Sequence, residues 1–270
     1  MKVISILRSL RKIYQFFIDR PFKIGEAIND CYEVRRIISS GSYGIVYLCK
    51  DSRTDDNLVI KQLRPSKRRS KSEIKLFKNE ISILRKLDHE YMPMLYEAFL
   101  IEGNYFYAMT FIDGDDLDEQ LFSNKKTFDE GESLFFLAQL LALVAYLHER
   151  DIYHQDLRIP NILLKNNYPY LIDFGLAMQA DSNNPSNKNK ELILEMKQQD
   201  YFDLGDILLF LFYSTYEAKN KKALPWTEEL SLTEESIRLL KRLLKIEKPY
   251  MSIKEISADL HAAIKAVNQE

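Results

Sequence analysis

Three short strings in a fixed order constrain this chain most. Residues 59–61 (VIK) end an apolar stretch in a lysine, residues 154–161 (HQDLRIPN) hold an aspartate and an asparagine five positions apart, and residues 173–175 (DFG) follow twelve positions after that asparagine. A lysine can bind phosphate, and carboxylate and amide oxygens are ligands that suit Mg²⁺. Each string alone is weak evidence, but together and in this order they predict a site for phosphoryl transfer.

The composition is that of a folded protein. The chain has 270 residues, of which 46% are hydrophobic and 29% are charged. These values are typical of globular proteins, and the length allows one large domain or two lobes. The net charge of −2 provides no general attraction to nucleic acid, so we expect no nucleic-acid partner.

Cysteine use and hydropathy indicate a cytoplasmic protein. Cys31 and Cys49 are too few for a disulfide framework, and their spacing is not that of zinc ligands. The longest apolar runs are Leu137–Leu147 and Ile207–Tyr213, which are shorter than the ~20 residues of a membrane-spanning helix. The first residues carry no small-residue cleavage site and no long apolar core, so a secretory signal is not expected.

The first part of the chain is dominated by strand signals. A glycine-bearing turn at residues 39–44 separates two of the expected strands, and the run Glu73–Leu87 places apolar residues at helical spacing. This pattern predicts a small, mostly antiparallel lobe of five strands and one helix. The expected strands are Tyr32–Ile38, Ile45–Cys49, Asn57–Leu63, Tyr96–Leu100 and Tyr105–Phe111.

After residue 116 the pattern becomes helical. Ser133–Glu149 and Asp200–Tyr213 are apolar on nearly every side, which predicts two buried helices. Capping-box patterns predict that further helices begin after Ser231 and Ser252. The polar run Asp181–Lys190 predicts a mobile loop.

On these motifs the chain resembles the eukaryotic-like (Hanks-type) serine/threonine protein kinases, and its size and its tyrosine- and lysine-rich composition resemble the bacterial members. The resemblance covers about Asp30 to Asn268. It implies an α+β, two-lobed kinase fold with a small lobe over residues 30–112 and a larger, mainly helical lobe over 113–270. It also implies ATP and Mg²⁺ as cofactors and a serine or threonine hydroxyl of a protein as the acceptor.

The resemblance assigns the nucleotide site. Lys61 would meet the α- and β-phosphates, oriented by Glu80, which lies nineteen positions further on. Met109 would guard the back of the pocket, the backbone of residues 110–112 would bind the adenine, and Asp116 would reach the ribose. Besides the lysine and its glutamate, the implied nucleotide-binding residues are Ile38, Ser39, Gly41, Gly44, Val46, Val59, Met109, Phe111, Ile112, Asp116, Leu163 and Ile172.

The same resemblance assigns the catalytic loop. Asp156 would orient the acceptor hydroxyl, and Arg158 would neutralise the γ-phosphate where the family has a lysine. Asn161 and Asp173 would bind Mg²⁺, and Asp200 would anchor the backbone of the loop.

His154 has no companion metal ligand, so it is better interpreted as a core residue. The resemblance stacks it with Phe174, Leu84 and Leu95.

Several family features are absent. Gln155 replaces an arginine that in many relatives reads a phosphate on the activation segment, so a phosphate on Ser182 or Ser186 would have no obvious receiver. The segment between residues 173 and 200 is short and lacks the A-P-E motif. The late arginine that pairs with this motif is also missing, and Tyr250 falls near its place.

These departures leave three functions open. The first is an active ATP-dependent serine/threonine protein kinase, and the second is a kinase of a small hydroxylated molecule, which the eroded peptide-docking segment favours. The third is a nucleotide-binding pseudokinase scaffold. The presence of the whole phosphoryl-transfer set argues against the scaffold.

The N-terminal segment, residues 1–24, reads as a basic amphipathic helix that is detachable from the kinase fold. It either packs on the small lobe or lies, through residues 1–20, on an anionic membrane surface. The apolar stripe consists of Val3, Ile6, Leu7, Leu10, Tyr14 and Phe17. Its charges are those of Lys2, Arg8, Arg11, Lys12, Arg20 and Lys23, against Asp19 alone.

Overall fold

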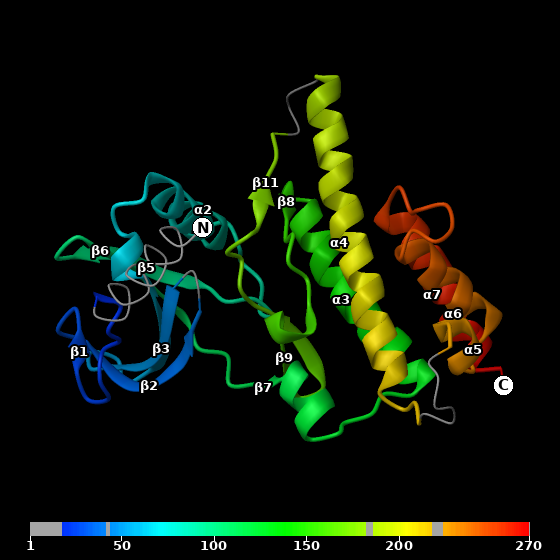
Figure 1. Ribbon diagram of the computed structural model, residues 1–270, viewed down its shortest axis with the longest axis horizontal. Coiled ribbons are helices and arrows are strands. Elements are labelled where there is room, and N and C mark those ends of the chain that lie inside the picture. The colour runs from blue at the N-terminus through cyan, green and yellow to red at the C-terminus, as the bar shows by residue number, and fades with distance from the viewer. Residues whose placement is uncertain (1–17, 42–43, 182–185, 218–223, 270) are drawn as a thin grey trace, which may run out of the picture. The chain divides into compact units, whose positions relative to one another are not determined.

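A computed structural model describes residues 18–41, 44–181, 186–217 and 224–269 (Figure 1). The chain divides into two compact units, Met1–Ile112 and Asp113–Glu270. The first carries a β-sheet and the second is mainly helical, which is the composition of the two lobes of a kinase. Most of the predicted N-terminal helix, residues 1–17, lies outside the described residues.

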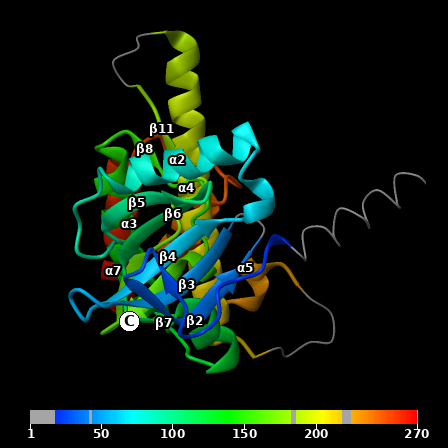
Figure 2. The same cartoon turned by 90° about the vertical axis from the view of Figure 1, so that its left-hand side faces the viewer.

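The first unit is built on one antiparallel sheet of six strands in the order β1-β2-β3-β4-β6-β5 (Figure 2). All five predicted strands are present, and the sheet gains the two-residue strand β1, which is too short to produce an alternating pattern. The strands are β1 (Ala27–Ile28), β2 (Tyr32–Ser40), β3 (Gly44–Asp51), β4 (Asn57–Leu63), β5 (Leu95–Ile101) and β6 (Asn104–Thr110).

Helix α2 (Lys71–Leu84) is the α-helix predicted for this unit, and the single-turn helix η1 (Pro65–Lys67) precedes it. The Ser70 side chain caps α2 by accepting the Glu73 N–H. The helix ends three residues before the predicted Leu87, because the chain tightens into turns in which N–H groups reach back only three residues, from Lys86 to Ile83 and from Leu87 to Leu84.

The second unit is built around four helices: α3 (Glu130–His148), α4 (Asn187–Tyr213), α6 (Glu234–Leu243) and α7 (Ile253–Val267). Helix α3 packs on α4 and α7, and α6 packs on the same two helices. Gly205 lets α4 approach α6 closely, because a Cβ there would lie only 2.7 Å from Cβ of Leu243. A short helix, α5 (Trp226–Glu229), precedes α6, and a single π-turn, η2 (Glu119–Ser123), precedes α3.

Helix α3 is, by length and composition alone, apolar enough to cross a membrane. Half of that apolar window is buried inside the protein, and the helix packs on α4, α7 and a neighbouring hairpin. The core helix of a folded unit has these same properties, so α3 is the first of the two predicted buried helices, here beginning at a complete capping box on Asp129.

Helix α4 begins thirteen residues before the predicted start at Asp200, at Asn187. The predicted loop over Asp181–Lys190 is therefore wrong over residues 187–190, and its residues 182–185 lie outside the described residues. The Ser186 side chain caps the helix by accepting the Asn189 N–H at 3.3 Å. The polar residues after it form the first turn of a helix whose later turns are buried. Figure 1 shows the N-terminal end of α4 extending past the neighbouring end of α3.

The predicted start of α6 is also shifted. Thr233 rather than Ser231 caps this helix, and its hydroxyl accepts the Ser236 N–H at 3.3 Å. The same hydroxyl donates to the carboxylate of Glu130 at 2.7 Å. This contact, with a residue far away in the sequence, favours Thr233 over Ser231 as the capping residue. Ser252 caps α7 as predicted.

Short strands complete the second unit. β9 (Ile162–Lys165) and β10 (Tyr168–Leu171) form a hairpin, and β7 (Asp115–Asp116) pairs with β9. β8 (Ile152–Tyr153) pairs with β11 (Met178–Gln179). The stretch between β8 and β9 contains the predicted catalytic loop and closes with the helical turn η3 (Ile159–Asn161).

Candidate active site

The predicted pair of Lys61 and Glu80 is present in the first unit. Lys61 Nζ lies 2.6 Å from Glu80 Oε1, and the side chains are 11% and 5% exposed. Lys61 comes from β4, and Glu80 comes from α2, which packs on the sheet through the contact of Phe77 with the Tyr107 ring of β6. Burial holds the ammonium in one orientation, which a strand-end lysine in solvent would not have.

The strand register gathers predicted nucleotide-pocket residues on one face of the sheet. Val46 is paired with Lys61 across β3 and β4, and Val59 is paired with Met109 across β4 and β6. Side chains directly opposite each other in an antiparallel pair point to the same face. Val59 and Lys61 are two positions apart, so all four share that face. The opposite face holds the hydrophobic core of Ile45, Tyr47, Cys49, Leu58, Ile60 and their neighbours.

The glycine-rich turn between β2 and β3 is closed by a hydrogen bond from Gly41 N–H to Gly44 O, at 3.1 Å. Gly44 has a packing reason to be glycine, because a Cβ there would lie 2.7 Å from the carbonyl oxygen of Gln62. Gly41 has open space around it. Arg64 binds the turn from outside by donating to Gly41 O at 2.6 Å and to Ser40 O at 3.2 Å.

In the second unit, Asp156 and Asn161 face each other across the catalytic loop. The Asn161 amide nitrogen donates both to the carboxylate and to the backbone carbonyl of Asp156, each at 2.9 Å. Asn161 is 4% exposed. Both donor positions of its amide face the loop, so the amide oxygen is directed elsewhere and is available to a cation.

The β9–β10 hairpin brings Asp173 to the same place. Ile162 pairs with Leu171 at the open end of the hairpin, and the next residue along, Ile172, donates its N–H to Asn161 O at 2.9 Å. Asp173 follows directly with a left-handed backbone, φ 60°.

Two further residues predicted to bind the nucleotide lie opposite each other on neighbouring strands. Leu163 on β9 pairs with Asp116 on β7. The Asp116 carboxylate accepts the Asp118 N–H at 2.8 Å, which fixes its orientation.

Asp200 anchors the loop as predicted. Its fully buried carboxylate accepts the N–H of His154 at 3.1 Å and that of Gln155 at 2.8 Å. His148 on α3 approaches the same carboxylate at 2.8 Å through its Nε2. One side chain of α4 therefore satisfies two buried backbone donors of the loop.

His154 is a core residue. It is fully buried, and its ring lies 4.9 Å from that of Phe174. Burial lowers its pKa, so the ring is neutral at pH 7. This agrees with the predicted stacking on Phe174. Leu84 and Leu95 belong to the other unit.

Gln155 has a structural role that its sequence position did not indicate. Its side-chain amide donates to Met196 O at 2.8 Å and to the Asp200 carboxylate at 3.1 Å. Gln155 therefore ties the catalytic loop directly to α4, at the position where, on the resemblance, many relatives have an arginine that reads a phosphate.

Arg158 lies beside the predicted catalytic aspartate. Its Nε is 3.4 Å from Asp156 Oδ1, and its side chain is 60% exposed. At this exposure the ion pair contributes little to stability, and the guanidinium is free to meet a solvent-borne anion.

Tyr250, which on the resemblance falls near the place of the missing late arginine, is buried in a closed cluster. Its hydroxyl donates to Asp259 at 2.7 Å, and the Arg242 guanidinium lies 3.8 Å above its ring and also pairs with Asp259. The Gln198 side chain of α4 donates to the Tyr250 carbonyl. This cluster supports α4 where the A-P-E motif and its arginine are absent.

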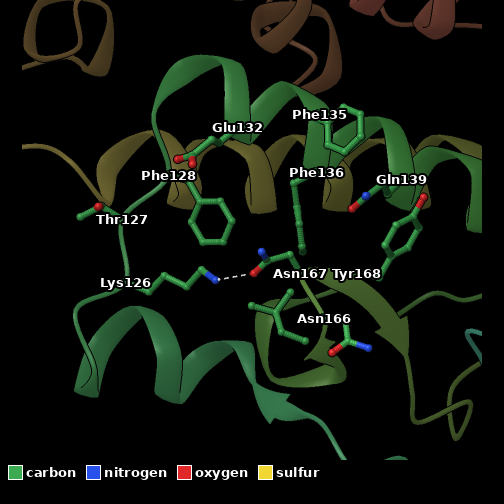
Figure 3. A pocket seen from close by; sticks show the side chains of 11 residues that line it. Lys126, Thr127, Phe128, Glu132, Phe135, Phe136, Gln139, Asn166, Asn167 and Tyr168 are labelled. Atoms are coloured by element: carbon green, nitrogen blue, oxygen red, sulfur yellow. Dashed lines mark hydrogen bonds between the residues drawn. The ribbon is translucent and has the colours of Figure 1, made fainter.

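A separate pocket of about 340 Å³ lies at the turn end of the β9–β10 hairpin, under the start of α3 (Figure 3). Aromatic rings line it beside a hydrogen bond of 3.1 Å from Lys126 to Asn167. Gln139 contributes a buried amide oxygen. Its described lining includes none of the predicted nucleotide or Mg²⁺ residues, and the predicted Mg²⁺ ligands sit at the opposite, open end of the hairpin.

Comparison with known proteins gives a consistent result. Residues 32–202 match the family model described as the protein kinase domain. The chain is 42% identical over 259 residues to the probable serine/threonine-protein kinase YbdM of Bacillus subtilis, a match that covers 96% of this chain and 99% of the relative.

More distant relatives are eukaryotic. The chain is 31% identical over 159 residues to the Arabidopsis thaliana serine/threonine-protein kinase AtPK1/AtPK6, covering 58% of this chain and 34% of that protein. It is 31% identical over 156 residues to human myosin light chain kinase family member 4, a match that covers 56% of this chain and 39% of that protein. Of the three functions left open by the sequence, these relatives support the first. The chain belongs to the protein kinase family and is a bacterial serine/threonine protein kinase of the Hanks type.

Proposed function

We propose that this kinase binds ATP with Mg²⁺ through the residues assigned above and transfers the γ-phosphoryl group to serine or threonine hydroxyls of proteins. The observation that carries the proposal is the arrangement of Asp156, Asn161 and Asp173 at one end of the β9–β10 hairpin. A carboxylate for the acceptor then lies beside two oxygen ligands for a metal, which is the arrangement that phosphoryl transfer requires.

The donor set fits Mg²⁺. Asn161 and Asp173 offer an amide oxygen and a carboxylate, both hard ligands, and Mg²⁺ is commonly held by one or two such side chains together with phosphate oxygens. Within the described ranges, no three or more His, Cys, Asp or Glu side chains gather as a metal site. The proposed site therefore depends on the nucleotide phosphates to complete it. When bound, the ion neutralises phosphate charge during transfer.

The Lys61–Glu80 pair supports the assignment of the nucleotide phosphates. The glutamate presents the ammonium on the face of the sheet that also carries Val46, Val59 and Met109. An apolar surface for the base beside an oriented cation for the phosphates is what a nucleotide requires.

Asp156 orients the acceptor hydroxyl in this proposal, and Arg158 meets the γ-phosphate. Asn161 holds the Asp156 carboxylate in place through its amide. Positioning and charge supply most of the rate in this reaction.

Nucleotide binding as a function of Mg²⁺ concentration tests these assignments separately. Asp173→Ala should weaken the Mg²⁺ dependence of binding of a non-hydrolysable ATP analogue, while Asp156→Asn should leave it unchanged. Equal behaviour of the two variants would contradict the division between a metal ligand and an acceptor-orienting residue.

We also propose that activity does not require a phosphate on the segment before α4. In support, the neutral side-chain amide of Gln155 joins the catalytic loop to Met196 O and to the Asp200 carboxylate through hydrogen bonds that need no added phosphate.

We propose a cytoplasmic kinase that contacts anionic membranes through residues 1–20. Support comes from the two free cysteines, Cys31 and Cys49, and from the basic, amphipathic pattern of the segment. Sedimentation with anionic and with neutral vesicles tests the contact. Salt-sensitive binding that is lost on deleting residues 2–20 supports it, whereas equal recovery of intact and truncated protein in the supernatant contradicts it.

A further inference from the structure

A second carboxylate of α4 also binds the catalytic loop. Asp203 lies one helical turn after Asp200, and its Oδ2 accepts the N–H of Leu157 at 3.3 Å. Its other oxygen accepts the side-chain amide of Gln199 at 2.7 Å. Leu157 is 3% exposed, so without Asp203 its N–H would be a buried donor with its acceptor removed.

The N–H that Asp203 binds belongs to the peptide bond between Asp156 and Leu157. The carbonyl of the same peptide bond accepts the Asn161 amide at 2.9 Å. A trans peptide is planar, and its N–H and C=O point in opposite directions. Asp203 and Asn161 therefore hold this one rigid plane from both sides, and the plane carries the Cα of Asp156.

The carboxylates of Asp200 and Asp203 bind different parts of the catalytic loop. Asp200 binds the N–H groups of His154 and Gln155, before the catalytic aspartate, and Asp203 binds the N–H group directly after it. Residues three positions apart lie on the same face of a helix, so a single rigid element presents both acceptors.

We propose that Asp203 is a positioning residue for phosphoryl transfer, whose carboxylate fixes the peptide plane of Asp156 and so aims that side chain at the acceptor hydroxyl. The inference rests on the proposed role of Asp156. Asp203 does not touch substrate and acts only through the backbone.

The charge of Asp203 matters to this role. A carboxylate is a stronger acceptor than a neutral acid, so the grip on Leu157 weakens when Asp203 is protonated. Burial, reinforced by the nearby charges of Asp200 and Asp156, raises its pKa to about 6. Among the ionisable groups of the surrounding elements, His148 of α3 lies 2.8 Å from Asp200, Tyr153 of β8 is acted on by the charge of Asp200, and Lys245 after α6 lies 5.5 Å from the Phe202 ring.

Three variants test the proposal in the full-length protein. Asp203→Ala removes the acceptor, and Asp203→Asn keeps its shape without its charge. Asp206→Asn is the matched control, an exposed aspartate one turn further along α4. The measurements are kcat and KM for ATP between pH 5 and 8, and amide hydrogen exchange of Leu157.

Asp203→Ala should lower kcat about 10- to 100-fold with KM for ATP unchanged within about threefold, because a misplaced catalytic group slows chemistry without removing nucleotide contacts. Wild-type kcat should fall as the pH drops through about 6, and Asp203→Asn should lack this acid limb. Leu157 exchange should be about five- to tenfold faster in Asp203→Ala at constant pH. Asp206→Asn should match the wild type throughout.

Wild-type kcat and an unchanged acid limb in both Asp203 variants would overturn the proposal. The proposal would also be overturned if Asp206→Asn lost as much kcat as the Asp203 variants, because that result would indicate a general weakening of α4. The exchange measurement does not depend on activity. If Asp156→Asn keeps normal turnover while Leu157 exchange responds to Asp203, the proposed role of Asp156 is wrong and the contact itself is right. If Leu157 exchange does not respond, the positioning contact is wrong.

Discussion

Asp19 and Arg64 form an ion pair of 3.2 Å that connects the end of the N-terminal segment to the glycine-rich turn. The Asp19 side chain is 4% exposed and also accepts the backbone N–H and the hydroxyl of Ser66, each at 2.8 Å. Arg64 in turn donates to the carbonyls of Ser40 and Gly41. The segment predicted to be detachable is therefore anchored to the small unit at this end.

Asp19→Ala should lower the free energy of unfolding by about 1–3 kcal/mol, because it strips a largely buried cation and a backbone donor of their acceptor. It should also raise KM for ATP a few-fold, since Arg64 loses the group that orients it against the turn. Urea denaturation and steady-state kinetics measure the two effects. Asp56→Ala, at an exposed turn in the same unit, is the control and should stay within about 0.5 kcal/mol of the parent. Equal stability of the two variants would show that the pair does not anchor the segment.

The two glycines of the turn should respond differently to alanine. Gly44→Ala places a Cβ 2.7 Å from Gln62 O, so it should destabilise the protein by about 1–3 kcal/mol. Gly41→Ala meets no atom within 4 Å and should leave the melting temperature unchanged. Its expected effect is a higher KM for ATP, because the methyl group obstructs approach of phosphate to the backbone. A matched loss of stability in both variants would contradict the assigned packing role of Gly44.

Removing the hydroxyls before α4 should change stability more than activity. Ser186→Ala deletes the N-cap of α4 and should lower the free energy of unfolding by about 1 kcal/mol. Ser186→Asp keeps a capping side chain and should restore most of that loss.

In both Ser186 variants, and in the double variant Ser182→Ala with Ser186→Ala, turnover should stay within a few-fold of the parent, because Gln155 needs no phosphate. A large loss of turnover in the double alanine variant, with Ser186→Asp fully active, would show that a phosphate on this segment is read after all.

The titration of Asp203 should change stability and activity in opposite directions. Burial raises its folded pKa from 3.8 to about 6, so between these two values the folded state binds more protons than the unfolded state. Stability from this group therefore rises as the pH falls from 7 towards 4, by about 1–3 kcal/mol. Activity should fall over the same range, because the charged carboxylate is what holds Leu157 firmly.

Urea denaturation of the wild type and of Asp203→Asn at a series of pH values measures the stability effect. The difference between their unfolding free energies isolates Asp203 from the other groups. If that difference does not change between pH 4 and 7, Asp203 is not a half-buried carboxylate with a raised pKa.

The motifs and the regular strands were predictable because each rests on a local pattern. An alternating strand such as β4 and a lysine at its end can be identified from neighbouring residues alone. The Lys61–Glu80 pair was predictable through the resemblance, which fixes the spacing that brings the two residues together.

The resemblance implied the Asp200 anchor, but the other contacts of α4 were not predictable in this way. Asn187–Lys190 has the composition of a loop, and its helix is supported by the Ser186 cap and by buried later turns. Asp203 resembles an ordinary polar residue on a helix, and only the folded chain brings it to Leu157, 46 positions away. The partner of Gln155 is a backbone carbonyl, and a sequence does not reveal which carbonyls a side chain will meet.

Transfer of radiolabel from γ-labelled ATP, first to the chain itself and then to a generic protein acceptor, tests the central claim most directly. The wild type should label at least one of them, and Lys61→Met and Asp156→Asn should each reduce transfer about 10²-fold or more with the melting temperature maintained. Lys75→Met, at an exposed lysine of α2, should be as active as the wild type. Near-normal transfer by Asp156→Asn, or no transfer by the wild type with Mg²⁺ present, would contradict the account.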